Sequence, residues 1–177
     1  MTRPALTCCL LATLTSVYAQ KVEREYEIGG DEVPEAIPAF LDSAYAKTPP
    51  ERLRFYRDVG EDGATVEAKF KIDGTRYSVE FADDGAWLDT EVEVPIDEID
   101  DAVWDRAACA RWTDTFELFR VVRVQHHRGA DGAEYYEAEL RVRVDREWLG
   151  YEYQLGLDGE ILAEKEILLS PGHLSRW

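Results

Sequence analysis

Strict alternation of apolar and charged residues is the clearest pattern in the chain, and it occurs in two stretches. The first stretch covers residues 66–72 and the second covers residues 136–144. A period of two places all the apolar side chains on one face of a β-strand. Further strands are predicted at residues 53–58, 77–81, 88–94, 116–128, 134–145, 148–157 and 160–169. Asp-Gly pairs at 73–74, 84–85, 131–132 and 158–159 indicate tight turns between them.

A helical period precedes each set of strands. In the first half, Pro34 suits a first helical turn and Pro49-Pro50 ends the segment. In the second half, four acidic residues crowd the helix start, where the helix dipole favours negative charge. The two apolar stripes are formed by Ile37, Phe40, Leu41, Ala44 and Tyr45, and by Ile96, Ile99, Val103, Ala107 and Ala110.

The two halves also share short sequences, which indicates an internal duplication. Glu32-Val33-Pro34 recurs as Glu93-Val94-Pro95, and the Tyr-rich strand with its Asp-Gly turn recurs 74 residues later, at Tyr151. We therefore predict an α+β fold of two tandem units, each a helix covering a four-stranded antiparallel sheet, with both helices on one face. The units are expected at residues 31–94 and 95–169, between a lead-in at 20–30 and a tail at 170–177.

The N-terminal segment is typical of a secretory signal peptide. Arg3 precedes an uncharged, mostly apolar run over residues 5–17, and Val17-Tyr18-Ala19 places small residues at a cleavage site. We predict a signal peptide over residues 1–19 with cleavage after Ala19, and therefore a periplasmic or secreted protein. Of the three cysteines, only Cys109 would remain, and its apolar-periodic segment predicts a small buried side chain.

Composition and charge exclude several classes of protein. The chain has 177 residues, a net charge of −17 and 45% hydrophobic residues, which is enough for a packed core. With 32% charged residues it does not read as a polytopic membrane protein, and no stable membrane insertion is expected. The negative charge opposes binding to nucleic acid or to anionic lipid, because both require a cationic surface.

The order of one helix and four strands, with its short motifs, resembles the PepSY-like family of small secreted bacterial proteins. The tandem arrangement resembles the architecture of beta-lactamase inhibitory protein. This resemblance implies exported binding or inhibitory modules, and it supplies no catalytic residues. The residues that carry it are Val33-Pro34, Ile37, Phe40, Tyr77, Val79, Phe81, Asp84-Gly85 and Leu88 in the first half, and Val94-Pro95, Ile99, Val103, Tyr151, Tyr153, Leu155, Asp158-Gly159 and Leu162 in the second.

A search for catalytic chemistry finds no candidate residues. No nucleophile elbow, phosphate-binding loop or zinc-protease motif is present. His126 and His127 are neighbours on a strand and point to opposite faces, so they cannot bind one ion together. We predict a non-enzymatic protein without a cofactor. Two alternatives remain open: a calcium- or cation-binding envelope protein that uses the acidic turns, and a ligand pocket or enzyme with a cavity between helix and sheet.

The sheet face opposite the helices is the predicted site of binding. Exposed Trp, Tyr and Arg side chains dominate protein interfaces. By strand parity, the outward residues also include Phe119, Arg54 and Arg123. We predict that this face binds a protein or peptide in the cell envelope, with inhibition of an enzyme as one outcome. The residues expected to bind are Trp87, Trp148, Tyr135 and Tyr56 as anchors, with Arg76 and Arg141 for polar register.

Overall fold

A computed structural model describes residues 24–60 and 63–167. Nine antiparallel strands form one sheet, in which each strand pairs with the next along the chain. The strands are β1 (Arg24–Ile28), β2 (Glu51–Gly60), β3 (Gly63–Ile72), β4 (Thr75–Ala82), β5 (Trp87–Glu93), β6 (Leu118–Gly129), β7 (Glu134–Val144), β8 (Glu147–Leu155) and β9 (Ile161–Ile167).

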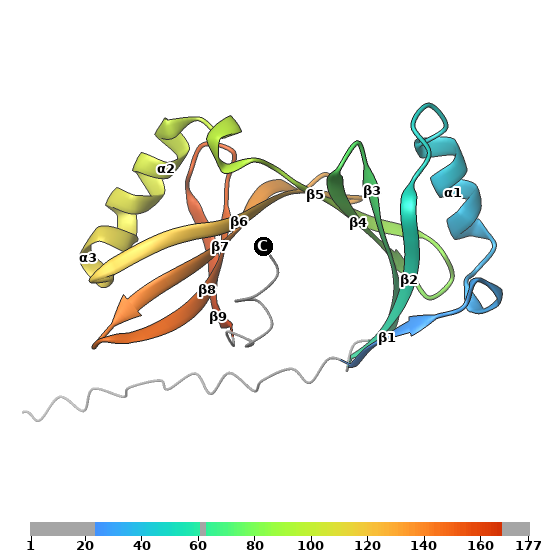
Figure 1. Ribbon diagram of the computed structural model, residues 1–177, viewed down its shortest axis with the longest axis horizontal. Helices are drawn as coiled ribbons and strands as arrows, with labels where there is room; N and C mark the ends of the chain where they lie inside the picture. Colours follow the sequence, from blue (N-terminus) through green and yellow to red (C-terminus); the bar gives the residue numbers. More distant parts are fainter. Residues whose placement is uncertain (1–23, 61–62, 168–177) are drawn as a thin grey trace, which may run out of the picture.

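The helices are short and lie on one side of this sheet. Helix α1 (Ala36–Ala44) follows the 3-10 turn η1 (Gly30–Glu32). After β5 come the 3-10 turn η2 (Ile96–Glu98), α2 (Asp101–Ala107), a π-helical stretch η3 (Ala108–Trp112) and α3 (Thr113–Thr115). Figure 1 shows the sheet curving into an arch, with α1 outside one arm and α2 and α3 outside the other. No helix among the described residues is long and apolar enough to cross a membrane.

The prediction of two separate helix-plus-four-strand units is wrong, because the two halves form one continuous sheet. Strand β5 pairs with β6 through five residue pairs, from Asp89 with Gly129 to Glu93 with Gln125. Strand β6 pairs with β5 along one edge and with β7 along the other, and residues Gln125 to Arg128 belong to both ladders. This pairing satisfies backbone groups that would otherwise lie on two open sheet edges. Strand β1, in the predicted lead-in, adds a ninth strand against β2.

The apolar face of the sheet packs under the helices in two clusters. Under α1, Ile37 and Leu41 contact the buried side chains of β3 and β4, among them Val66 and Phe81. Under α2 and η3, Val103 and Trp112 contact β6, β7 and β8. Trp112 lies with its ring 5.5 Å from that of Tyr153 and is 1% exposed. Burial of these apolar side chains is the main stabilising contribution to the fold.

The prediction of a buried Cys109 is wrong, because this side chain is exposed. Cys109 lies two positions after the buried Ala107, which places it on the opposite side of the helix. A helical period of 3.6 would continue the buried stripe from Ala107 to Ala110, but η3 adds a residue to the turn. The next buried position after Ala107 is therefore Trp112, and Ala110 faces water.

Two of the Asp-Gly turns pack directly against the helices. Gly85 and Gly159 have φ of +87° and +86°, in the region that favours glycine. A Cβ added at Gly85 would lie 2.9 Å from the Cβ of Ala36, and one at Gly159 would lie 2.9 Å from the Cα of Val103. Each glycine thus completes a turn and also lets a helix approach the sheet closely.

Candidate binding face

The concave side of the arch is the candidate functional site. Within residues 24–60 and 63–167, every helix lies on the outer side of the sheet, as Figure 1 shows. The concave side carries the alternate residues of each strand, and these residues align in rows across the sheet. One row runs from Arg54 through Lys69, Ser78, Glu91 and His127 to Tyr135. We call this surface the concave face.

Five of the six predicted binding residues lie on the concave face, but in two groups. Tyr56 and Arg76 belong to the arm formed by β2–β4, where the ammonium of Lys69 lies 4.8 Å from the Tyr56 ring centre. The other arm holds Tyr135, Arg141 and Trp148. Strand pairing therefore places both groups on the same side of one sheet, with β5 between them.

Trp148 and Arg141 form the most exposed aromatic contact of this face. The guanidinium carbon of Arg141 lies 5.4 Å from the Trp148 ring centre, in cation–π geometry. Trp148 is 48% exposed, and Leu118 lies in the same cross-strand row, joined to it through Arg143. An indole held by a guanidinium and still open to solvent is suited to bury against a partner.

The prediction that Trp87 faces away from the helices is wrong, and the same holds for Phe119. A bulge between Trp87 and Asp89 shifts the register, so that Trp87 pairs with the buried Phe81. Its ring stacks on that of Phe40 in α1, with 6.0 Å between centres, and its Nε1 donates to the carbonyl oxygen of Asp89 at 2.7 Å. A second bulge, in β6, places Phe119 against Trp112. An extra residue in a strand reverses the facing of every residue beyond it.

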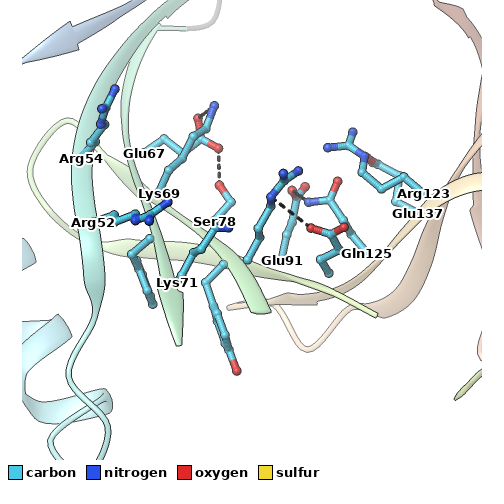
Figure 2. A pocket seen from close by; sticks show the side chains of 14 residues that line it. Arg52, Arg54, Glu67, Lys69, Lys71, Ser78, Glu91, Arg123, Gln125 and Glu137 are labelled. Carbon is cyan, nitrogen blue, oxygen red and sulfur yellow. Dashed lines mark hydrogen bonds and ion pairs between the residues drawn. The ribbon is translucent and has the colours of Figure 1, made fainter. Parts of the chain in front are cut away.

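A hollow of about 450 Å³ lies on the concave face, across β2–β7. Figure 2 shows Arg52, Arg54 and Lys71 at one end, and Arg123 and Glu137 at the other. Serine and glutamine side chains lie between them, and Ser78 donates a hydrogen bond to Glu67. This polar hollow lies on the side of the sheet opposite the helices, whereas the predicted alternative places a cavity between helix and sheet.

Acidic residues concentrate where the two arms meet. Burial and the charges of Glu80 and Glu91 raise the pKa of Asp89 to about 7. Burial and the charges of Glu152 and Glu91 likewise raise the pKa of Glu137 to about 7. Burial first, and then Glu67, also raise the pKa of Glu91. Asp89 and Glu137 therefore change charge near neutral pH.

Sequence reasoning missed this cluster as a unit. The alternation in residues 88–94 places Asp89 and Glu91 on the outward face, but it does not show which strand lies beside them. Because the β5–β6 pairing was not predicted, Glu91 and Glu137 could not be placed near each other. Acidic residues at alternate positions of two strands, one in each half, would have been the signal.

The two histidines of β6 lie on opposite faces of the sheet, as predicted. His127 stacks on Tyr135 at 4.2 Å, and burial lowers the pKa of this histidine. His126 lies on the helix side, against Tyr136. In the described part of the chain, no group of three or more His, Cys, Asp or Glu side chains is arranged to hold a metal ion.

Comparison with known proteins gives likenesses in structure. No family model matches the chain, and no curated protein matches it. A DUF2874 family protein from Bacteroides uniformis has a TM-score of 0.60 at 18% identity, covering 76% of this chain and 89% of that one. A presumed periplasmic protein from Bacteroides eggerthii has a TM-score of 0.61 at 18% identity, covering 80% and 94%.

A BLIP-like protein from Bacteroides fragilis has a TM-score of 0.54 at 19% identity, covering 82% of this chain and 93% of that one. This likeness supports the predicted resemblance in architecture, whereas no comparison shows membership of the PepSY-like family. At these identities the likeness concerns the fold. The chain therefore has a fold that is shared with a BLIP-like protein and with DUF2874 family proteins of Bacteroides.

Proposed function

We propose that this protein is an exported, non-enzymatic module that binds a protein partner in the cell envelope through its concave face. The observation that carries the proposal is the one-sided cover of the sheet. All described helices pack on the outer side, while the concave face presents Trp148, Tyr135 and Tyr56 with arginines beside them. Aromatic and arginine side chains are the commonest sources of binding energy in protein interfaces.

In this proposal Trp148 is the main anchor, and Tyr135 and Tyr56 extend the contact to both arms. Arg141 keeps the indole in place, and Arg76 supplies a charged contact in the other arm. Trp87 has no part in binding, because its ring packs on α1. Inhibition of an envelope enzyme follows if the partner places its active site against the concave face. The likeness to the BLIP-like protein supports that form of binding.

Export is the second element of the proposal and rests on the sequence of residues 1–19, which lie outside the described residues. The likeness to a presumed periplasmic protein supports it. When the full chain is produced in a Gram-negative bacterium, we expect the periplasmic fraction to hold a protein beginning at Gln20. Intact-mass measurement tests this, and a full-length mass in the cytoplasm would contradict it.

Replacement of Trp148 by Ala is expected to weaken partner binding at least about tenfold, because the loss of an interface anchor costs about 2 kcal/mol or more. Its effect on stability should be small, since the side chain is 48% exposed. The test immobilises residues 20–177, captures partners from an envelope extract of the source organism, and then measures affinity for each purified partner by calorimetry.

Tyr26→Ala is the matched control for this experiment. Tyr26 is 49% exposed and pairs with Arg57, on the helix side of the sheet. The Tyr26→Ala variant therefore lacks an aromatic side chain of similar exposure, but on the opposite face of the sheet. Equal losses of affinity in Trp148→Ala and Tyr26→Ala would reject the concave face as the binding surface.

A further inference from the structure

We infer that the cationic end of the hollow, formed by Arg52, Arg54, Lys71 and Arg76, receives an acidic segment of the protein partner. This inference rests on the proposed function and names the chemistry that the partner would bring to the β2–β4 arm. Arg52, Arg54 and Lys71 lie at the opposite end of the hollow from Arg123 and Glu137, as Figure 2 shows, and Arg76 pairs with Lys71 in the β3–β4 ladder.

The hollow has a local excess of positive charge. The chain as a whole has 37 acidic residues against 20 Lys and Arg. The lining of the hollow reverses that balance, with six basic residues and four acidic ones. In so acidic a protein, a cationic cluster inside a recess provides a place on the concave face where an anionic group meets several cations together.

At this end of the hollow, like charges pair directly across neighbouring strands. Lys71 lies opposite Arg76 in the β3–β4 ladder, and Arg54 lies opposite Lys69 in the β2–β3 ladder. Like charges that face each other in this way destabilise a sheet. Within each of these two pairs, the cations repel each other less once a carboxylate binds between them. A bound acidic segment would therefore offset a cost that is already present in the free protein.

The cations of the hollow differ in the ion pairs that they already make. Lys69 is compensated by Glu25 at 2.6 Å and Glu67 at 2.8 Å. Arg54 has one exposed partner, Glu27 at 3.6 Å, and Arg76 has one, Glu93 at 3.5 Å. Among the described residues, neither Arg52 nor Lys71 lies within 4.0 Å of an acidic group.

Local backbone structure directs Arg52 into the hollow. The β2–β3 register shifts between Glu51 and Arg54, and Arg52 has φ of +56° at this bulge. A residue other than glycine rarely adopts that conformation. The bulge brings the guanidinium of Arg52 beside Arg54 and Lys71, as Figure 2 shows. Guanidinium groups bind carboxylates through two parallel hydrogen bonds, which favours a peptide carboxylate as the ligand.

The test is an NMR titration of ¹⁵N-labelled residues 20–177 with a hexaglutamate peptide blocked at both ends, at 10–20 mM salt. We expect saturable shifts confined to amides of β2, β3 and β4 around Arg52, Lys71 and Arg76. Hexaglutamine should give none. Binding should weaken strongly at about 0.15 M salt, where the screening length falls to about 8 Å.

The decisive variant is Arg52→Gln with Lys71→Gln, which we expect to weaken hexaglutamate binding about fivefold or more, since each exposed ion pair contributes up to about fivefold. The variant should fold, because removing Lys71 lessens its repulsion with Arg76. The control is Arg128→Gln with Arg146→Gln, which removes the same charge from exposed positions away from the hollow. The control should bind like the unaltered protein.

Three results would overturn the inference: no saturable shifts, shifts outside the hollow, or equal loss of binding in both double variants. Equal shifts with inorganic phosphate alone would also overturn it, because they would show a general anion site. Failure here, with partner binding still dependent on Trp148, would reject only the acidic segment. Loss of the Trp148 dependence would reject the proposed function itself.

Discussion

Gly159→Ala is expected to lower the free energy of unfolding by about 2–5 kcal/mol. Two costs add at this position. Alanine at φ of +86° adopts a left-handed conformation, which costs about 1 kcal/mol or more. Its Cβ would also lie 2.9 Å from the Cα of Val103, so the turn or α2 must move, which costs about 1–3 kcal/mol. Urea unfolding followed by circular dichroism measures the loss.

Gly132→Ala is the matched control for the steric part of this effect. Gly132 has φ of +87°, but a Cβ there would have no atom within 4 Å. Gly132→Ala has only the conformational cost, so we expect its free energy of unfolding to fall by about 1 kcal/mol. Similar losses in the two variants would show that the close approach of the Asp158-Gly159 turn to α2 contributes nothing to stability.

The second large effect is expected from Glu137→Gln, which should change how stability depends on pH. The pKa of Glu137 is about 7 in the folded protein, above its ordinary value of 4.5. Between these two values the folded protein holds a proton that the unfolded chain releases. The contribution of Glu137 to stability is therefore complete below about pH 4.5 and is lost as the pH rises through 7.

Glutamine cannot ionise, so the variant lacks this loss. From pH 5 to pH 8 we expect the stability of Glu137→Gln to rise relative to the unaltered protein by about 1–2 kcal/mol, after allowing for screening by water at a partly exposed site. Urea unfolding at four pH values tests this. Glu147→Gln removes one negative charge from an exposed position at the start of β8, on the other side of the sheet, and serves as control. Parallel pH curves for Glu137→Gln and the unaltered protein would contradict the prediction.

Local patterns in the sequence predict the strands and turns well. The alternation in residues 66–72 gives β3 and its buried face, with Val66, Ala68 and Phe70 all under α1. The Asp-Gly pairs fall at turns with positive φ, as at Gly74 and Gly132. These features depend on neighbours in sequence, so the sequence alone contains the information.

Features that depend on one extra residue or on a distant partner were not predictable in this way. One additional residue in a helical turn exposes Ala110, and one in β5 turns Trp87 toward α1. No change in composition marks either position. The pairing of β5 with β6 depends on segments more than thirty residues apart, and with it the arrangement of the acidic cluster. In the candidate site, the alternation of residues along each strand predicts that Tyr135 and Trp148 lie on the concave face. The same alternation does not predict the hollow.

The five residue pairs between β5 and β6 have one more consequence. Backbone hydrogen bonds, and no free linker, set the spacing and the angle between the two arms. In the proposed function the concave face is therefore preorganised, so little conformational entropy would be lost when a partner docks. Such a surface selects partners by the match of their curvature, and substitutions that change the twist of β5 would alter affinity without touching a contact residue.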